Sequence, residues 1–300
     1  MSNYILSCCS TVDVTEDFLR SRDIEYVYFN YNIDGKACHD DFGRTNSPAT
    51  LYARMLAGAD VVTSQVSVGE YQEFWRPFLE AGKDVLHVTL SSGISGTYNS
   101  ACTARDLLKD EYPNQKIVVV DSLCASSGYG MLMDRLADLR REGMGLEDLA
   151  AWARQHRQEV QHWFFSSDLT FFMRGGRISK VAGVAGGLLR ICPVMDVAPD
   201  GSLAMIEKIR TKAKAKRRVV DIMRATAFGG EGYTGRAFLC NSECADDARD
   251  VATMVEQAFP QMDGRVQVFD IGATIGCHTG PGTVALFFWG DASGRKSAAR

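Results

Sequence analysis

The chain has 300 residues, which is enough for two domains, and 46% of them are hydrophobic, so a sizeable core can be buried. The formal net charge of −4 lacks the basic surplus usual in nucleic-acid-binding proteins. No run of about 18 apolar residues predicts a transmembrane helix, and the N-terminal segment lacks the basic stretch of a signal peptide. The nine cysteines are scattered without a CxxC pair. These features predict a cytoplasmic protein with reduced thiols and no metal site.

Short apolar or aromatic runs in the first half of the sequence predict β-strands. They lie at residues 4–7, 24–31, 61–62, 85–90 and 117–120. One helix is expected to begin with Ser47 as its cap and Pro48 at the first helical position, and another with the capping box of Ser67 and Glu70. Further helices are expected at about 97–112, 128–141 and 146–160. Strands separated by helices favour βαβ units and a largely parallel sheet.

The second half of the sequence shows a different pattern. Strands are predicted at residues 163–165, 194–197, 203–209, 237–240, 266–269 and 284–289. Helices are predicted at 184–190, which is rich in small residues, from Thr211 onward, and at 246–259. We therefore predict an α/β protein with an N-terminal α/β domain at 1–162 and a C-terminal α+β domain with a mixed sheet at 163–290. Residues 291–300 are expected to form a frayed tail.

Two basic segments each have more than one interpretation. Arg174 and Arg177 flank two glycines, which could form a phosphate-binding loop or simply a tight turn. A second run begins the helix after Thr211 and favours a solvated helix face, with a docking patch for an acidic partner as the alternative. It consists of Lys212, Lys214, Lys216, Arg217 and Arg218.

Hydroxyl side chains follow three of the predicted strands, in Thr63-Ser64, in the segment 91–97 and at Ser122. Ligands of parallel sheets bind beyond the carboxyl ends of the strands, so we expect these hydroxyls to meet at one edge. The segment 91–97 joins a strand to a helix through serines and glycines. Such a loop can bind an anion through backbone N–H groups and the helix N-terminus, or its serines can merely cap the helix. Both interpretations remain open on these residues alone.

Six segments in this order resemble the DegV family, which includes the fatty-acid-binding subunits of bacterial fatty acid kinase. The resemblance covers about 3–289, nearly the whole chain. The segments are Thr63-Ser64-Gln65, Leu90 to Ala101, Val120-Asp121-Ser122, Arg174 to Ser179, Lys208-Ile209-Arg210 and Ile275 to Gly282. One departure concerns the first loop, because family members usually carry Asp-Ser-Thr-x-Asp where this chain has Cys9-Ser10-Thr11-Val12-Asp13.

The resemblance implies a DegV-like fold with a lipid site between the two domains. By resemblance, the carboxylate of one long-chain fatty acid is held by Thr63 and Ser95, with Ser92 as the neighbour expected to help. His278, Arg177 and Arg174 are carried over as a supporting polar network. The protein itself would catalyse nothing and need no cofactor. It would present the carboxylate to the catalytic subunit of a fatty acid kinase, which forms an acyl phosphate for phospholipid metabolism.

The energetics of such a ligand agree with this assignment. A C16 tail has roughly 14 methylenes at about 0.8 kcal/mol each, so its burial contributes on the order of 11 kcal/mol. Association and ordering remove about 4–15 kcal/mol, so the tail supplies most of the affinity and the head mainly sets the orientation. The small residues beside Leu188 and Leu189 could leave room for a chain or could serve close helix packing; they are Gly183, Ala185, Gly186 and Gly187.

Two other classes of function compete with the carrier. A serine-nucleophile acyl hydrolase or transferase would use Ser92 or Ser95 with His278. Neither serine lies in a G-x-S-x-G elbow, and no third member of a triad is evident. A phosphate or nucleotide binder is the last alternative, and no Walker A or G-x-G-x-x-G motif supports it.

Overall fold

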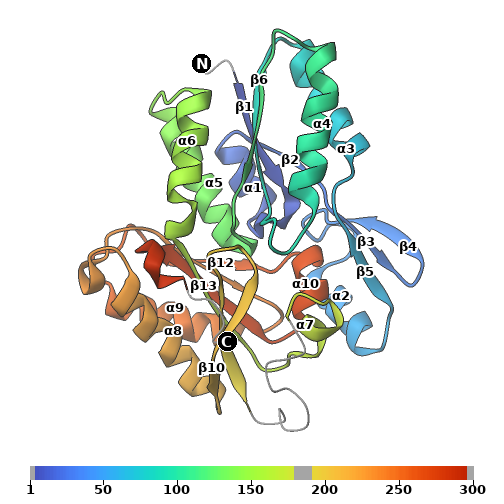
Figure 1. Cartoon of the computed structure of the whole chain (residues 1–300). Helices are drawn as coiled ribbons and strands as arrows, with labels where there is room; N and C mark the ends of the chain where they lie inside the picture. The colour runs from blue at the N-terminus through green and yellow to red at the C-terminus, as the bar shows by residue number, and fades with distance from the viewer. Residues whose placement is uncertain (1–3, 179–190, 296–300) are drawn as a thin grey trace.

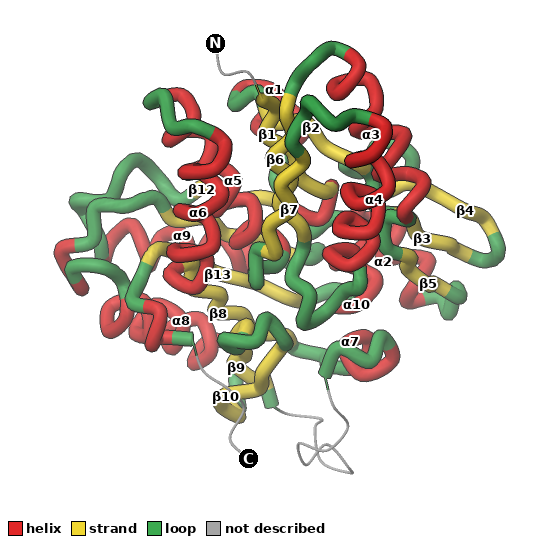
Figure 2. The backbone as a smooth tube through the Cα atoms, turned by 45° about the horizontal axis from the view of Figure 1, so that its top comes forward, coloured by secondary structure: helices red, strands yellow, loops and turns green. Residues whose placement is uncertain are grey.

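A computed structural model describes residues 4–178 and 191–295 of the chain. These residues form two large β-sheets, a small third sheet and the helices that cover them (Figures 1 and 2). The helix expected at 184–190 lies outside the described residues. The predicted fold class, a mixed α/β protein with one parallel and one mixed sheet, is confirmed.

The first large sheet is parallel, in the order β2-β1-β6-β7. Its strands are β1 (Tyr4–Cys9), β2 (Ile24–Val27), β6 (Asp84–Thr89) and β7 (Ile117–Asp121). The helices α3 (Val68–Glu80) and α4 (Thr97–Glu111) lie together on one side of it, and α5 (Ser126–Arg141) and α6 (Leu146–His156) lie on the other (Figure 1). The short helix α1 (Glu16–Ser21) packs beside β2. The capping box of Ser67 and Glu70 begins α3 as predicted.

The second large sheet is mixed, in the order β10-β9-β8-β13-β11-β12. Its strands are β8 (Val160–Ser166), β9 (Cys192–Val197), β10 (Leu203–Ile209), β11 (Ala237–Asn241), β12 (Gln267–Asp270) and β13 (Thr283–Trp289). The helices α8 (Lys212–Thr226) and α9 (Ala245–Ala258) cover one face. Because side chains alternate along a strand, Val284, Leu286 and Phe288 pack toward these helices. Ala285 and Phe287 point the other way, into the core shared with the first sheet.

The predicted strand at 24–31 is in fact two strands in different sheets. After β2 the chain leaves the parallel sheet, and β3 (Asn30–Ile33) pairs antiparallel with β4 (Lys36–His39) and β5 (Val61–Ser64). Asp34 and Gly35 form the two-residue turn between β3 and β4, both with positive φ. An Asp-Gly pair between strands is a strong hairpin signal, which the sequence interpretation missed. Thr63 therefore lies in this small antiparallel sheet, and its predicted position at the carboxyl edge of the parallel sheet is wrong.

Three short helices pack beside the small sheet. They are α2 (Pro48–Leu56), which Ser47 caps as predicted, α7 (Thr170–Arg174) and α10 (Ala273–Thr279). Helix α10 contacts α2, α7, β3 and β5. His278, expected in a glycine-rich loop, lies in the last turn of α10. The small sheet and α10 thus bring Thr63 and His278 together, although the two are far apart in the sequence.

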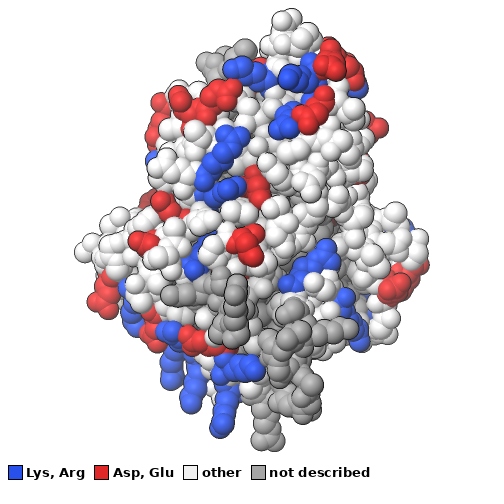
Figure 3. Space-filling model, in the orientation of Figure 1, with Lys and Arg blue, Asp and Glu red and all other residues white. Residues whose placement is uncertain are grey.

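The basic run on α8 is not one solvated face. Lys216 is 9% exposed and pairs with Asp247 and Asp250, and Lys212 also pairs with Asp247. Lys214 and Arg217 are exposed. Figure 3 shows Lys and Arg side chains projecting at the lower edge of the molecule, where α8 and β10 lie. Lys212 and Lys216 therefore belong to the contact between α8 and α9 and not to a solvated face.

Among the described residues, no helix combines the length and the apolar character needed to cross a membrane. This finding agrees with the lack of a long apolar run in the sequence.

The segment 291–295 was expected to fray and instead packs against the protein. Its last residue, Arg295, is 3% exposed. The guanidinium donates to the carbonyl oxygens of Leu123 at 2.6 Å, of Arg157 at 2.9 Å and of Val160 at 2.9 Å. The segment therefore closes the junction between the end of β7 and the start of β8.

We predict that Arg295→Ala lowers the free energy of unfolding by about 1.5–3 kcal/mol, because it leaves buried carbonyl groups without their charged donor. Urea denaturation of the purified variant measures this change. Arg265→Ala is the control, since the side chain of Arg265 is 89% exposed, and a change within about 0.5 kcal/mol is expected there. Equal stability of both variants would mean that the segment 291–295 does not hold this junction.

Candidate functional site

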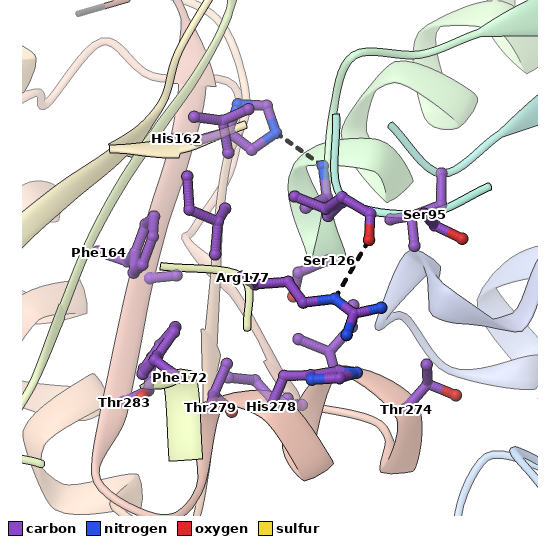
Figure 4. A pocket seen from close by; sticks show the side chains of 18 of the residues that line it. Ser95, Ser126, His162, Phe164, Phe172, Arg177, Thr274, His278, Thr279 and Thr283 are labelled. Carbon is purple, nitrogen blue, oxygen red and sulfur yellow. Dashed lines mark hydrogen bonds between the residues drawn. The ribbon is translucent and has the colours of Figure 1, made fainter. Parts of the chain in front are cut away.

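A cavity lies between the inner face of the mixed sheet, the loop after β6 and helix α10 (Figure 4). Its apolar lining residues are Phe29, Leu90, Ile94, Ala125, Phe164, Phe172, Val197, Leu203, Cys240, Ile271, Ile275, Ala285 and Phe287. Its polar lining residues are Thr63, Gln65, Ser95, Ser126, His162, Arg177, Thr274, His278, Thr279 and Thr283. Although ten of these residues are polar, the surface of the cavity is mostly apolar, which is usual for a small-molecule site.

The apolar wall is built by the alternation along β8 and β13. Phe164 on β8 pairs with Ala285 on β13, and both side chains line the cavity. Phe172 on α7 stacks on Phe164 with ring centroids 6.1 Å apart, and Figure 4 shows the two rings on the same side of the cavity. Phe287 lies two residues farther along β13. This wall can accept an extended hydrocarbon chain.

His278 and Thr63 form the central contact of the polar part. The Oγ1 atom of Thr63 lies 2.8 Å from Nε2 of His278. The other ring nitrogen, Nδ1, is buried and has no hydrogen-bond partner among the described residues. A Cβ atom at Gly175 would lie 2.2 Å from Nδ1, so only glycine lets the loop after α7 pass this close to the ring.

His278 is neutral at physiological pH. Burial lowers the pKa of its imidazole to about 4, and the positive charge of Arg177 acts in the same direction. The ring can therefore exchange one hydrogen bond with Thr63 without adding a positive charge to the cavity.

Arg177 is the one Lys or Arg among the described residues that line the cavity. Its Nε donates to the carbonyl oxygen of Ile94 at 3.3 Å, and its Nη1 donates to that of Gly175 at 2.5 Å. No carboxylate forms a salt bridge with it within the described part of the chain. In Figure 4 its side chain reaches across the cavity toward the loop that carries Ser95. A half-buried guanidinium without an acidic partner favours an anionic ligand.

The loop after β6 brings Ser95 to the cavity and leaves Ser92 outside. Ser91 anchors this loop, since its hydroxyl donates to the carbonyl of Gly201 at 2.8 Å. The Ser95 hydroxyl accepts the N–H of Thr97 at 3.2 Å and lines the cavity. Ser92 is exposed and is not among the described lining residues.

Arg174 also lies outside the cavity lining that the structure describes. Its side chain is exposed, and its guanidinium carbon lies 5.6 Å from the ring centroid of Phe171. Of the predicted residues, the structure thus brings Thr63, Ser95, Arg177 and His278 to one cavity. It does not bring Ser92 or Arg174 there.

Several lining residues were missed in the sequence. His162 was given no role, yet it lines the cavity, while its Nδ1 bonds the carbonyl of Val160 and its Nε2 accepts the N–H of Ala125. Thr283 was also missed. It belongs to the same alternating face as Ala285 and Phe287, so the period-two pattern of this strand could have identified it.

The segment 9–13, whose sequence differs from the usual Asp-Ser-Thr-x-Asp motif, supports the site from outside the cavity. The Asp13 carboxylate accepts the N–H of Gly272 at 2.9 Å and the hydroxyl of Ser126, and burial raises its pKa. The Asp40 carboxylate accepts the N–H of Ala273 at 3.1 Å and the N–H of Thr274 at 3.0 Å. Two buried carboxyl groups thus hold the N-terminus of α10, the helix that carries His278.

Cys9, which stands in place of the usual acid, takes no part in this contact. Its thiol lies 3.3 Å from the hydroxyl of Tyr71, and its backbone N–H donates to the hydroxyl of Tyr129 at 3.0 Å. Position 9 is therefore part of the buried core at the end of β1, and it is not among the described lining residues.

The sheets and the cavity define an α/β protein that encloses a mostly apolar site. Thr63, Ser95, Arg177 and His278 lie together on one side of it, which we call its polar end, and His162 lines the cavity apart from them. A family model described as uncharacterised protein, DegV family, matches residues 9–291. The chain belongs to the DegV family, as its sequence predicted.

Relatives of the chain match it over nearly their whole length. A DegV domain-containing protein of Clostridium perfringens is 30% identical over 291 residues, which are 97% of this chain and 99% of the relative. A DegV family protein of Thermus thermophilus, solved in a study of its fatty acid binding, has a TM-score of 0.85 at 28% identity and covers 96% of this chain and 99% of its own. The Fatty Acid Kinase B3 protein of Streptococcus pneumoniae, loaded with linoleic acid, shares the fold with a TM-score of 0.82 at 20% identity, over 97% and 100% of the two chains.

We predict that the lipid-free protein loses stability as the pH falls from about 6.5 to 4, partly because of His278. The unfolded chain takes up a proton on this residue near pH 6.5, whereas the folded pKa is about 4. Inside this window the unfolding free energy of His278→Gln should depend less steeply on pH than that of the original protein, by about 1.4 kcal/mol per pH unit. Urea denaturation at several pH values measures the slope. Asp13 and Asp40 titrate in both proteins and cancel in the difference, so equal slopes would contradict a depressed pKa at His278.

We also predict that Asp40→Ala destabilises the protein by about 1.5–3 kcal/mol, because two N–H groups of α10 lose a charged acceptor. Asp40→Asn keeps one acceptor oxygen and should lose less. Thermal or urea denaturation compares the two variants, with Asp110→Asn on the exposed end of α4 as the control. If Asp40→Ala behaves like that control, the carboxylate does not hold α10.

Proposed function

We propose that the protein binds one long-chain fatty acid, with its tail along the apolar wall and its carboxylate at the polar end. The observation that carries this proposal is the convergence of Thr63, Ser95, Arg177 and His278 on one cavity whose surface is mostly apolar. The fatty acid binding named for the Thermus thermophilus relative supports the same ligand class.

The polar end can stabilise a desolvated carboxylate. Arg177 supplies one positive charge without an acidic partner among the described residues, so the ligand would complete the pair. The hydroxyls of Thr63 and Ser95 can donate to the same carboxylate, and the neutral ring of His278 orients Thr63. These contacts fix the head, while burial of the tail provides most of the affinity.

We further propose that the protein is a carrier without activity of its own, which presents the carboxylate to a fatty acid kinase for acyl-phosphate formation. The family resemblance supports this partner, and one structural neighbour is named for such a kinase. A carrier needs a head group that is held in place without a covalent bond, and hydroxyl donors meet that need.

The serine-nucleophile alternative has no specific support in the geometry. Its base would be His278, but Nε2 of that ring contacts Thr63 at 2.8 Å rather than a serine. The Ser95 hydroxyl accepts a backbone N–H instead. Ser92, the other candidate nucleophile, is exposed outside the cavity.

We predict that Ser95→Ala and Thr63→Val each weaken fatty acid binding by about 1.5–3 kcal/mol, the range for hydrogen bonds to a charged group. Each single variant should keep some lipid, because the tail is still buried. Ser95→Ala should lose more acyl-phosphate formation with a cognate kinase than lipid occupancy, since the reacting oxygen must be held in line. Native mass spectrometry measures the bound acid, and a kinase assay on the same preparation measures the product.

The control for this experiment is Ser92→Ala, in the same loop but outside the cavity lining, which should leave both quantities unchanged. Unchanged occupancy and product in Ser95→Ala and Thr63→Val as well would show that the carboxylate is held elsewhere. Hydrolysis of an acyl thioester by the protein alone, abolished in Ser95→Ala, would instead support the serine enzyme.

A further inference from the structure

Facing residue pairs follow one another along the inner face of β8 and β13. In chain order of β13 they are Thr283 with Ser166, Ala285 with Phe164, Phe287 with His162, and Trp289 with Val160. Phe164, Ala285, Phe287 and His162 line the cavity, whereas neither member of the last pair is among the described lining residues. In the part of the chain that the structure describes, this wall of the cavity therefore ends at His162 and Phe287.

A series of contacts places the polar end at the opposite end of this wall. The ring of Phe164 stacks on Phe172 of α7. The loop after α7 passes His278 so closely that a Cβ atom at Gly175 would lie 2.2 Å from Nδ1 of its ring. His162 lies two residues from Phe164 along β8, or about 7 Å away. Figure 4 shows His162 on one side of Phe164, and Phe172 and His278 on the other. A tail whose carboxylate is at the polar end would therefore pass Phe164 before it reaches His162.

Contacts on three sides fix His162 in this position. Its Nδ1 bonds the carbonyl of Val160 at 2.8 Å, and its Nε2 accepts the N–H of Ala125 at 3.3 Å. Arg295, which is not among the described lining residues, places Nη2 3.4 Å from Nδ1. A Cβ atom at Gly128 would lie 2.3 Å from Nε2, so α5 leaves no space for the ring to move in that direction. The ring therefore cannot turn away from the end of a tail.

The ring of His162 also offers a tail no free polar group. Both ring nitrogens are bonded to backbone groups. Burial lowers the pKa of the imidazole well below its usual range, and the charge of Arg295 acts in the same direction. The ring is therefore neutral and can pack against a terminal methyl group. A tail that extended past the ring would meet the buried guanidinium of Arg295, which a hydrocarbon cannot solvate.

We propose that His162 forms the closed end of the cavity and sets the longest tail that the protein can bury. This proposal rests on the proposed function and specifies its chain-length selectivity. Each additional buried methylene raises the affinity about fourfold. Through a series of saturated acids the affinity should therefore rise by this factor per carbon until the terminal methyl meets His162. We call the acid at which the rise stops the limiting length. Longer acids should bind no better, because the closed end would be overpacked.

The experiment measures the affinity of the delipidated protein for saturated acids from decanoic to eicosanoic acid, one carbon apart, by competition with a fluorescent fatty acid. His162→Ala removes the ring and should raise the limiting length by about two carbons. Ala125→Val adds two methyl groups next to the ring and should lower it by about one carbon. Ala125→Val keeps the backbone N–H that bonds His162, so it tests the closed end without removing a hydrogen bond.

Phe164→Leu is the matched control. It removes bulk one pair nearer the polar end, beside the tail and not at its end. It should lower the affinity for all acids that reach this pair by a similar factor and leave the limiting length unchanged.

The outcomes separate this proposal from the proposed function. The same limiting length in the original protein, His162→Ala and Ala125→Val overturns the closed-end proposal and leaves fatty acid binding intact. A shift in Phe164→Leu as large as that in His162→Ala also overturns it. If thermal denaturation shows that His162→Ala is unfolded, the shift in Ala125→Val decides alone. Failure of every acid to bind the original protein contradicts the proposed function itself.

Discussion

The mixed sheet must bury both of its faces, and the rest of the structure depends on that constraint. On β13 the side chains of Val284, Leu286 and Phe288 meet α8 and α9, while Ala285 and Phe287 face the first sheet. A sheet with two apolar faces needs a cover on each side. The helices of the second half cover one face, and the first half covers the other. The cavity lies within this second contact, so it exists only when both halves are in place.

The polar end of the cavity follows from how α10 is held. Asp13 and Asp40 bind backbone N–H groups at the start of this helix, and Gly175 leaves room for the ring of His278 near its end. Burial then keeps the imidazole neutral, and among the described lining residues Arg177 remains as the cation. A neutral ring beside a single guanidinium suits one carboxylate, because a second positive charge would have to be desolvated as well.

Where the sequence interpretation failed, long-range packing decided the outcome. The run at 24–31 looks like one strand because most of its residues are apolar or aromatic, but the hairpin at Asp34 and Gly35 draws its second half into another sheet. Arg295 looks like part of a polar tail, yet three carbonyl groups distant in sequence bind it. The local sequence does not identify partners that lie far away along the chain.

The sequence by itself determined the family, the parallel and mixed sheets, and the segments that contribute Thr63, Ser95 and His278, because strand periodicity, helix caps and ordered motifs are local properties. Only the tertiary structure decided that Ser92 and Arg174 turn away from the cavity while Thr279 and Thr283 line it. The direction of a side chain depends on the backbone around it and on the elements that pack against it. Two serines of the same motif can therefore differ in position: Ser95 lines the cavity, whereas Ser92 is exposed outside it.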